Sequence, residues 1–263
     1  MLDLGMPTLI ELKGLEAHAA LCASLGLRFV EINVSFPQYR PERLGADFLN
    51  ALREEYGVYF TIHLDESADV CCANRRAAEA YLDEIVSLAS LARDARIPSL
   101  NMHLQRGVYV TLPGRRTYVY AENEELYLED LRRLRERFAA AAGGADVHLN
   151  VENTDGYSPP FLRHALDTLL ESPAFGLTYD VGHDAAIGWQ DLPVISSYPG
   201  RLRHMHLHDA RGKSVHLALG DGELDIPRFL RLAGDNGCRV VLETKTVEAL
   251  SASAAYLRER GAM

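Results

Sequence analysis

The chain has 263 residues, of which 48% are hydrophobic and 24% are charged, a composition that excludes a disordered chain and can enclose a large core. The formal net charge of −10 opposes a partner held mainly through phosphate contacts, so nucleic acid is disfavoured. No apolar run approaches the ~20 residues of a membrane span, and the first positive charge, Lys13, follows an acidic residue, unlike a secretory leader. The four cysteines show no C-x-x-C spacing, and we expect free thiols in a cytoplasmic protein without a membrane partner.

Short apolar runs alternate with longer amphipathic segments along the whole chain. Helical patterns follow each of these runs and are clearest at residues 73–96 and 122–142. No G-x-G-x-x-G turn follows the first run, which disfavours an open dinucleotide-binding sheet. We therefore predict an α/β fold, a single (β/α)₈ TIM barrel over residues 1–263. The predicted strands are residues 4–9, 29–34, 58–63, 99–103, 147–152, 176–180, 202–207 and 239–244.

Two connections, residues 104–121 and 208–224, are longer than barrel loops usually are, and long loops in compact domains are usually functional. The first contains two alternating runs, 108–112 and 117–120, on either side of Pro113 and Gly114. This pattern predicts a small hairpin that could act as a lid.

Ionisable residues recur near the carboxyl ends of the predicted strands, where a buried parallel strand should be apolar. In a TIM barrel these ends meet at one mouth, the face on which barrel enzymes carry their chemistry. Carboxylates packed together there repel one another, so the cluster predicts a bound divalent cation. The residues are Glu31, His63, His103, Glu152, Asp180, His206 and Glu243.

Each of these residues could instead be an individually satisfied polar group at the barrel rim, and Glu31 could pair with a nearby arginine. Three histidines, His204, His206 and His208, alternate along one strand and so point to the same side. We expect His206 to be the ligand, His204 to be a deeper polar filler, and His208 to be a loop residue or a partner of a ligand. His183 follows Asp180 beyond a glycine, a spacing that suits a neighbouring substrate or metal contact.

The chain resembles the xylose isomerase-like TIM barrels, which include ketose 3-epimerases, inosose-type dehydratases and endonuclease IV. The resemblance covers almost the whole sequence. It rests on the phrases Phe-Val-Glu31-Ile-Asn, Thr-Ile-His63, Asn-Met-His103, Asn-Val-Glu152-Asn, Asp180-Val-Gly-His183, His-Met-His206-Leu-His-Asp209, Leu-Gly-Asp-Gly222-Glu and Leu-Glu243-Thr.

Resemblance to the epimerases implies that Glu152, Asp180, His206 and Glu243 hold one Mn²⁺, Mg²⁺ or Co²⁺ ion. The reaction it implies is isomerisation or epimerisation of a sugar, polyol or sugar phosphate beside a metal-bound carbonyl, with Glu152 and Glu243 moving the protons. The small sugar-like substrate is the expected partner, and a homo-oligomer is compatible with the sequence. Candidate contacts to substrate hydroxyls or to a phosphate are His183, His63, His103 and Arg211, with Lys213, Arg115 and Arg116 as further basic residues.

Resemblance to endonuclease IV implies an alternative, a zinc-dependent phosphoesterase with further ligands at His63, His103, His183 and His216. The third zinc site of that enzyme resembles His183 plus a D-x-H pair, but the pair here reads Ser214-Val-His216, and serine is a poor zinc ligand. A site for two metals, Zn²⁺ included, and a barrel that binds metal or ligand without catalysis both remain open. These hypotheses differ in metal stoichiometry.

Overall fold

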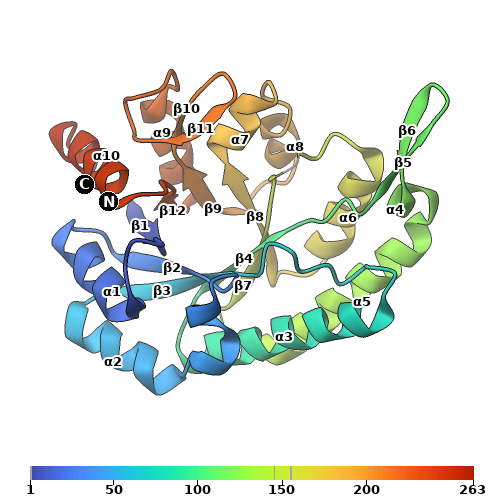
Figure 1. Cartoon of the computed structure of the whole chain (residues 1–263), viewed down its shortest axis with the longest axis horizontal. Coiled ribbons are helices and arrows are strands. Elements are labelled where there is room, and N and C mark those ends of the chain that lie inside the picture. Colours follow the sequence, from blue (N-terminus) through green and yellow to red (C-terminus); the bar gives the residue numbers. More distant parts are fainter. Residues whose placement is uncertain (1, 145, 155) are drawn as a thin grey trace.

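The computed structural model describes residues 2–144, 146–154 and 156–263. Within these residues eight parallel strands close into a barrel, in the order β1-β12-β9-β8-β7-β4-β3-β2. Helices surround the barrel, and a two-stranded hairpin, β5–β6, projects from one side (Figure 1). The predicted (β/α)₈ barrel is confirmed.

Each predicted strand overlaps an observed one, and the differences fall at the ends. The first and last strands were predicted too long, because Thr8, Leu9, Glu243 and Thr244 belong to the loops at the barrel mouth. The barrel strands are β1 Asp3–Pro7, β2 Phe29–Asn33, β3 Tyr59–His63, β4 Ser99–His103, β7 His148–Glu152, β8 Phe175–Asp180, β9 Leu202–Leu207 and β12 Arg239–Leu242.

The barrel interior is more polar than the predicted apolar runs suggest. Because side chains alternate along a strand, residues two apart share a face, and these pairs carry polar groups on several strands. Glu31 of β2 contacts His204 of β9, and these strands are not neighbours in the barrel, so both side chains cross the interior. The polar pairs are Thr61 and His63, Asn101 and His103, Asn150 and Glu152, Thr178 and Asp180, and His204 and His206.

The helices cover the outside of the barrel with their apolar faces. The longest, α3, begins after Asn74, whose side chain accepts from the amides of Arg76 and Ala77. Residue Gly143 ends α5 in the left-handed conformation, with φ of 64°. The helices are α1 Gly14–Ser24, α2 Ala46–Tyr56, α3 Arg75–Asp94, α4 Val119–Glu122, α5 Glu124–Ala142, α6 Pro160–Leu170, α7 Val181–Ala186, α8 Leu192–Ser196, α9 Ile226–Asn236 and α10 Val247–Glu259, with short 3₁₀ turns at Pro37–Tyr39 and Pro41–Arg43.

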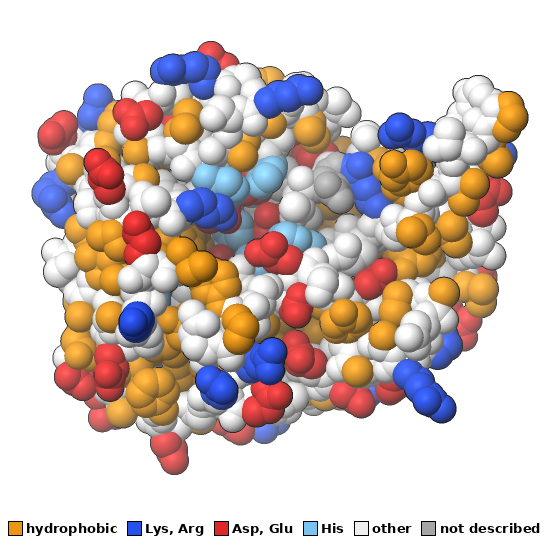
Figure 2. Space-filling model, in the orientation of Figure 1, with side chains coloured by type: hydrophobic (Ala, Val, Ile, Leu, Met, Phe, Trp, Pro, Cys, Tyr) orange, Lys and Arg blue, Asp and Glu red, His pale blue; other side chains and the backbone are white. Residues whose placement is uncertain are grey.

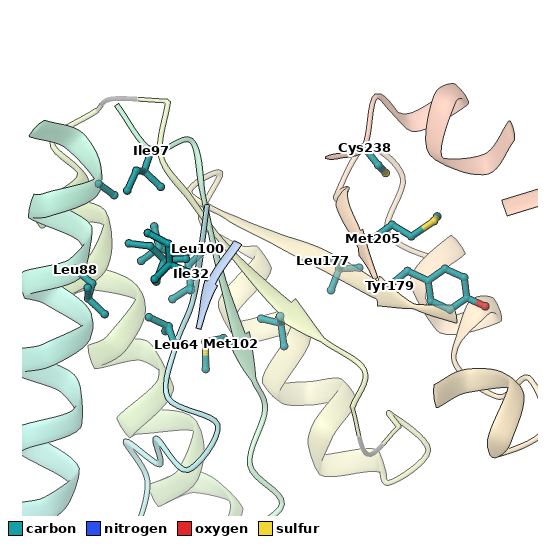
Figure 3. Close-up of a cluster of buried hydrophobic side chains, with 14 of the residues drawn as sticks. Ile32, Leu64, Leu88, Ile97, Leu100, Met102, Leu177, Tyr179, Met205 and Cys238 are labelled. Carbon is teal, nitrogen blue, oxygen red and sulfur yellow. The ribbon is translucent and has the colours of Figure 1, made fainter. Parts of the chain in front are cut away.

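The hydrophobic core lies between the strands and these helices. Figure 3 shows Leu88 of α3 beside Ile97, Leu100 and Ile32 on one side of the barrel. All four side chains are at most 2% exposed. This outer layer fixes the barrel and leaves its interior free for polar groups.

Both long connections form hairpins. The predicted one is confirmed as β5 Tyr109–Leu112 and β6 Arg115–Tyr118, joined at Pro113 and Gly114. The second connection contains an unpredicted hairpin, β10 Asp209–Arg211 with β11 Ser214–Leu217. Among the described residues, no helix is both long and apolar enough to cross a bilayer.

Candidate functional site

Four neighbouring strands bring together the side chains predicted to hold a metal. In barrel order, β7 ends at Glu152, β8 ends at Asp180, β9 carries His206, and Glu243 directly follows β12. One potential ligand atom each from Glu152, Asp180 and His206 lies within 4.8 Å of the others. The Nδ1 atom of His206 is 3.3 Å from Oε2 of Glu243. The strand ends therefore deliver all four groups to one place.

His206 is the centre of this cluster, and its Nδ1 atom is 3.3 Å from Oε2 of both Glu152 and Glu243. Both Nδ1 and the Glu243 Oε2 are buried without a hydrogen-bond partner. A cation at this point would satisfy these acceptors, and the oxygen-rich donor set fits a hard divalent ion.

The charges of this cluster depend on one another. Burial alone would raise the pKa of Glu152 and Glu243, but the His206 imidazole beside them holds both values well below the usual range. Burial likewise opposes the charged form of His206, but Glu152, Glu31 and Glu243 raise its pKa well above the usual value. A charged imidazolium thus supplies the positive charge when no metal does.

Asp180 is held from several sides. Asn153 brackets its backbone, accepting from the Asp180 amide at 2.7 Å and donating to its carbonyl at 3.1 Å. The carboxylate Oδ1 accepts from the amide of His183 at 2.7 Å and lies 3.2 Å from Nε2 of His208. Asp180 is therefore fixed before any ligand binds.

Three histidines, His183, His208 and His216, form a second cluster beside Asp180. The Nδ1 of His208 accepts from the amide of His216 at 2.8 Å, so its proton lies on Nε2, towards Asp180. His208 therefore supports a predicted ligand, as the sequence suggested. His216 has a φ of 58° and its Nδ1 lies 3.1 Å from the Glu243 carbonyl, an arrangement that leaves its Nε2 available. Burial lowers the pKa of His216 to about 4.

His63 and His103 lie on the other side of Glu152. Their Nε2 atoms are 3.4 Å and 3.7 Å from Oε2 of Glu152. The Nδ1 of His63 donates to the carbonyl of Leu64 at 2.8 Å, which directs its Nε2 towards the carboxylate. Burial opposes the charged form of both, but Glu152 raises the pKa of His63 to about 9, whereas that of His103 stays below its usual value.

Glu31 pairs with His204 and His206, which excludes the pairing with an arginine that the sequence left open as an alternative. Its Oε2 lies 2.9 Å from Nε2 of His204, and its Oε1 lies 2.9 Å from Nε2 of His206. Glu31 and His204 are 173 residues apart in the chain, and closure of the barrel brings them into contact. His204 is completely buried, as expected for a deep polar filler.

A cavity of about 240 Å³ opens beside the carboxylates. Figure 2 shows histidine and acidic side chains gathered in a hollow of the face that it presents. Leu9, Ile10 and Phe36 form an apolar part of the cavity wall, and Lys245 reaches Oε1 of Glu243 at 2.8 Å. Lys245 was not predicted as a site residue, because a lysine just after a strand is usually a solvated surface residue.

Two asparagines were also missed as site residues. Asn101 donates to Oε2 of Glu152, and Asn153 holds Asp180. Asparagine is depleted in strands. Its presence near the strand ends, in Asn101-Met-His103 and Glu152-Asn153, could therefore have indicated a role in the site.

The basic residues suggested for a phosphate lie outside this cavity's lining. Arg211 is exposed and donates to the carbonyl of Asp221 at 2.7 Å, while Lys213 is exposed on the turn that follows. On the β5–β6 hairpin, Arg115 lies 3.9 Å from Glu122, and Arg116 lies over the Tyr109 ring.

Several solved structures share this fold. A D-tagatose 3-epimerase-like protein superposes with a TM-score of 0.77 and 18% identity, covering 98% of this chain and 96% of that chain. The 3-keto-D-glucoside 4-epimerase from E. coli gives 0.75 and 14%, covering 98% and 100%. D-psicose 3-epimerase from Clostridium cellulolyticum H10, solved with D-tagatose, gives 0.75 and 14%, covering 98% of each chain. At these identities the likeness shows the fold.

No curated protein sequence matches the chain. A family model described as xylose isomerase-like TIM barrel matches residues 19–260, nearly the whole length, and confirms the resemblance inferred from the motifs. The chain belongs to the xylose isomerase-like TIM barrel family.

Proposed function

We propose that this chain is a divalent-metal-dependent isomerase or epimerase that acts on a sugar, a polyol or a sugar phosphate. The observation that carries the proposal is the pair Glu152 and Glu243. They come from the two ends of an arc of four neighbouring strands, and each places an oxygen 3.3 Å from Nδ1 of His206. The epimerases among the solved structures with this fold support the same reaction class.

Glu152, Asp180, His206 and Glu243 would hold the ion, which when bound polarises a substrate carbonyl and so acidifies the neighbouring C–H bond. One glutamate removes this proton, and the electron pair of the broken bond delocalises onto the carbonyl. The other glutamate, which must carry a proton in the substrate complex, returns that proton to the opposite face of the same carbon. The delocalised electron pair then forms the new C–H bond, and the carbon is inverted. Thr154 and Asn101 orient Glu152 for this step, and Lys245 orients Glu243.

The rest of the substrate would occupy the cavity beside Glu243. Its apolar wall suits the C–H face of a carbon chain. Substrate hydroxyls would meet His63 in the cavity wall, His103 beside Glu152, and His183 beside Asp180. Among the described residues, the cavity lining contains one lysine, one histidine and no arginine. Lys245 is paired with Glu243, and His63 faces Glu152. An uncharged sugar is therefore favoured over a sugar phosphate, and Arg211 would contact only a group that extends beyond the cavity.

Incubation of the Mn²⁺-loaded protein with a panel of ketoses, ketose phosphates and polyols in D₂O tests the reaction. NMR should show a new epimer with one deuterium at the inverted carbon. Glu152→Gln and Glu243→Gln should each lose about 10²- to 10⁴-fold of the rate, the usual contribution of a general acid or base. Glu248→Gln, on the exposed face of α10, is the matched control and should keep the wild-type rate. A metal-loaded protein that neither exchanges deuterium nor turns over any member of the panel would contradict the proposal.

A second ion is supported by another group of potential ligands, which shares Glu152 with the first. His63, His103 and Glu152 offer atoms within 4.8 Å of one another, and two imidazoles suit Zn²⁺. Metal analysis of protein equilibrated with Zn²⁺ should then give two ions per chain, and His63→Ala should reduce this to one. If the wild type and His63→Ala each bind a single ion, His63 and His103 are not metal ligands and would contact substrate hydroxyls instead.

This second group also favours one alternative function, a zinc-dependent phosphoesterase of the endonuclease IV type. Against it, the described cluster of His183, His208 and His216 contains no carboxylate, and both nitrogens of His208 are already engaged. Cleavage of an abasic DNA duplex by the zinc-loaded protein, abolished by Glu152→Gln, would establish this alternative. We expect no cleavage.

A further inference from the structure

Glu31 occupies the interior of the barrel directly behind His206, and its side chain is 3% exposed. Its Oε2 accepts from Thr61 Oγ1 at 3.2 Å and lies 2.9 Å from Nε2 of His204. Its Oε1 is 2.9 Å from Nε2 of His206. Thr61 and His204 thus fix one carboxylate oxygen, and the other faces the back of the His206 ring.

We propose that Glu31 is a positioning residue that holds the proton of His206 on Nε2 and so presents the Nδ1 lone pair to the metal. The inference rests on the proposed function, because it requires a metal at Nδ1. A neutral imidazole has one N–H and one lone pair, so an acceptor at one nitrogen determines which nitrogen can bind a cation. A carboxylate behind a histidine ligand also makes the ligand more basic.

The surroundings of His206 support this role. Its Nε2 is buried without a hydrogen-bond partner of good geometry, and the Glu31 carboxylate oxygen lies 2.9 Å from it. The ring stacks against His63, with 5.8 Å between centroids and 27° between planes, which restrains its tilt. Glu31 lies on β2 and His206 on β9, so the contact spans the interior rather than bracing adjacent strands. A residue that only filled the barrel would not need a charge at this point.

Calorimetric titration with Mn²⁺ tests the proposal on wild-type protein and three variants. Glu31→Gln replaces the acceptor with an amide, and Glu31→Asp keeps the charge but withdraws it by one methylene group. Both should weaken Mn²⁺ binding by about 10- to 100-fold, the usual effect of removing such a partner. Glu66→Gln removes one exposed charge from the rim of the same cavity without contact to His206, so it should change the Kd by less than about threefold.

The outcomes separate positioning from packing and from charge. The proposal is overturned if the Glu31→Gln variant melts at a lower temperature but binds Mn²⁺ as tightly as the wild type. The role of Glu31 would then be structural. It is also overturned if Glu31→Asp binds Mn²⁺ with wild-type affinity while Glu31→Gln does not. The charge of residue 31, and not its contact with His206, would then determine the affinity. If wild-type protein binds no Mn²⁺, the proposed function fails, and this inference with it.

A second measurement applies even if the Glu31 variants do not fold. In zinc-loaded wild-type protein with ¹⁵N-labelled histidine, long-range ¹H–¹⁵N spectra should show His206 protonated at Nε2 and zinc-bound at Nδ1. A proton on Nδ1 would overturn the assignment.

Discussion

The ammonium of Lys245 lies 2.8 Å from Oε1 of Glu243, while the other oxygen of that carboxylate faces His206. A flexible, exposed lysine contributes modestly in such a pair, because water screens it. Its place in the cavity wall nevertheless means that it orients a proposed catalytic group from the side where substrate enters.

Lys245→Met should lower kcat by about two- to tenfold, the effect of ~0.5–1.4 kcal/mol, because Glu243 loses the partner that orients it. Steady-state kinetics on the epimerised sugar measure this. Lys13→Met, which removes an exposed lysine at the start of α1, should leave kcat unchanged. Equal rates for wild type and Lys245→Met would remove Lys245 from the proposed machinery.

Gly182 shows how closely the site is packed. A Cβ atom at this position would lie 2.0 Å from Cε1 of His208, so an alanine must displace the ring that supports Asp180. We expect Gly182→Ala to weaken Mn²⁺ binding by about 10- to 100-fold, measured by calorimetry. Gly234→Ala in α9 meets only a side-chain carbon at 3.7 Å and should bind Mn²⁺ normally. Undiminished binding by Gly182→Ala would mean that His208 does not support the metal site.

At the scale of elements, the β10–β11 connection depends on one buried carboxylate. Asp209 is 1% exposed and accepts from the amides of Gly220 and Leu224 at 2.9 Å and 3.1 Å. The chain passes so close to it that a Cβ at Gly222 would lie 2.1 Å from its Oδ1. The phrase Leu-Gly-Asp-Gly222 is thus explained by the turn that surrounds Asp209.

Asp209→Ala should reduce the free energy of unfolding by about 2–4 kcal/mol, because the amides of Ala210, Gly220 and Leu224 lose their acceptor and that of Ala210 is buried. Urea denaturation measures the loss. Asp221→Ala, an exposed change in the same connection, should alter stability by less than about 0.5 kcal/mol. If Asp209→Ala also loses less than about 0.5 kcal/mol, other contacts maintain the turn.

The loop between β1 and α1, which supplies Leu9 and Ile10 to the cavity, is held by a neutral histidine. Nε2 of His18 accepts from the amide of Leu9 at 2.8 Å, and its Nδ1 lies 2.7 Å from the carbonyl of Gly14. Burial lowers the pKa of His18 below 6.5, although these backbone contacts oppose the shift.

The unfolded chain therefore binds a proton at His18 more readily than the folded chain does. The stability that neutral His18 contributes is present above pH 6.5 and is lost as the pH falls towards its folded pKa. We expect His18→Ala to cost about 2–4 kcal/mol at pH 8 and clearly less at pH 5, measured by urea denaturation. A cost independent of pH would show that His18 acts through packing alone.

Local patterns predicted the elements well, because buried parallel strands are short apolar runs whose period differs from that of the helices. The β5–β6 hairpin was predicted from its turn residues. The β10–β11 hairpin was not, because its strands are short and two residues of β10, Asp209 and Ala210, accept from the amides of Gly220 and Glu223 beyond the hairpin, contacts that local composition does not reveal.

At the scale of the whole molecule, the sequence predicted which residues would gather but not how they would contact one another. Strand-end positions sufficed for Glu152, Asp180, His206 and Glu243, because barrel topology brings all strand ends to one mouth. The pairing of Glu31 with His206 depends on which strands face each other across the closed barrel, and the part played by Lys245 depends on a rotamer. Neither is encoded in local sequence.

The most direct test is the anomalous scattering of manganese in crystals soaked with Mn²⁺. We predict a strong peak within bonding distance of Nδ1 of His206 and of carboxylate oxygens from Glu152, Asp180 and Glu243. An absence of any peak at these residues under saturating Mn²⁺, or a peak held by other side chains, would contradict the account.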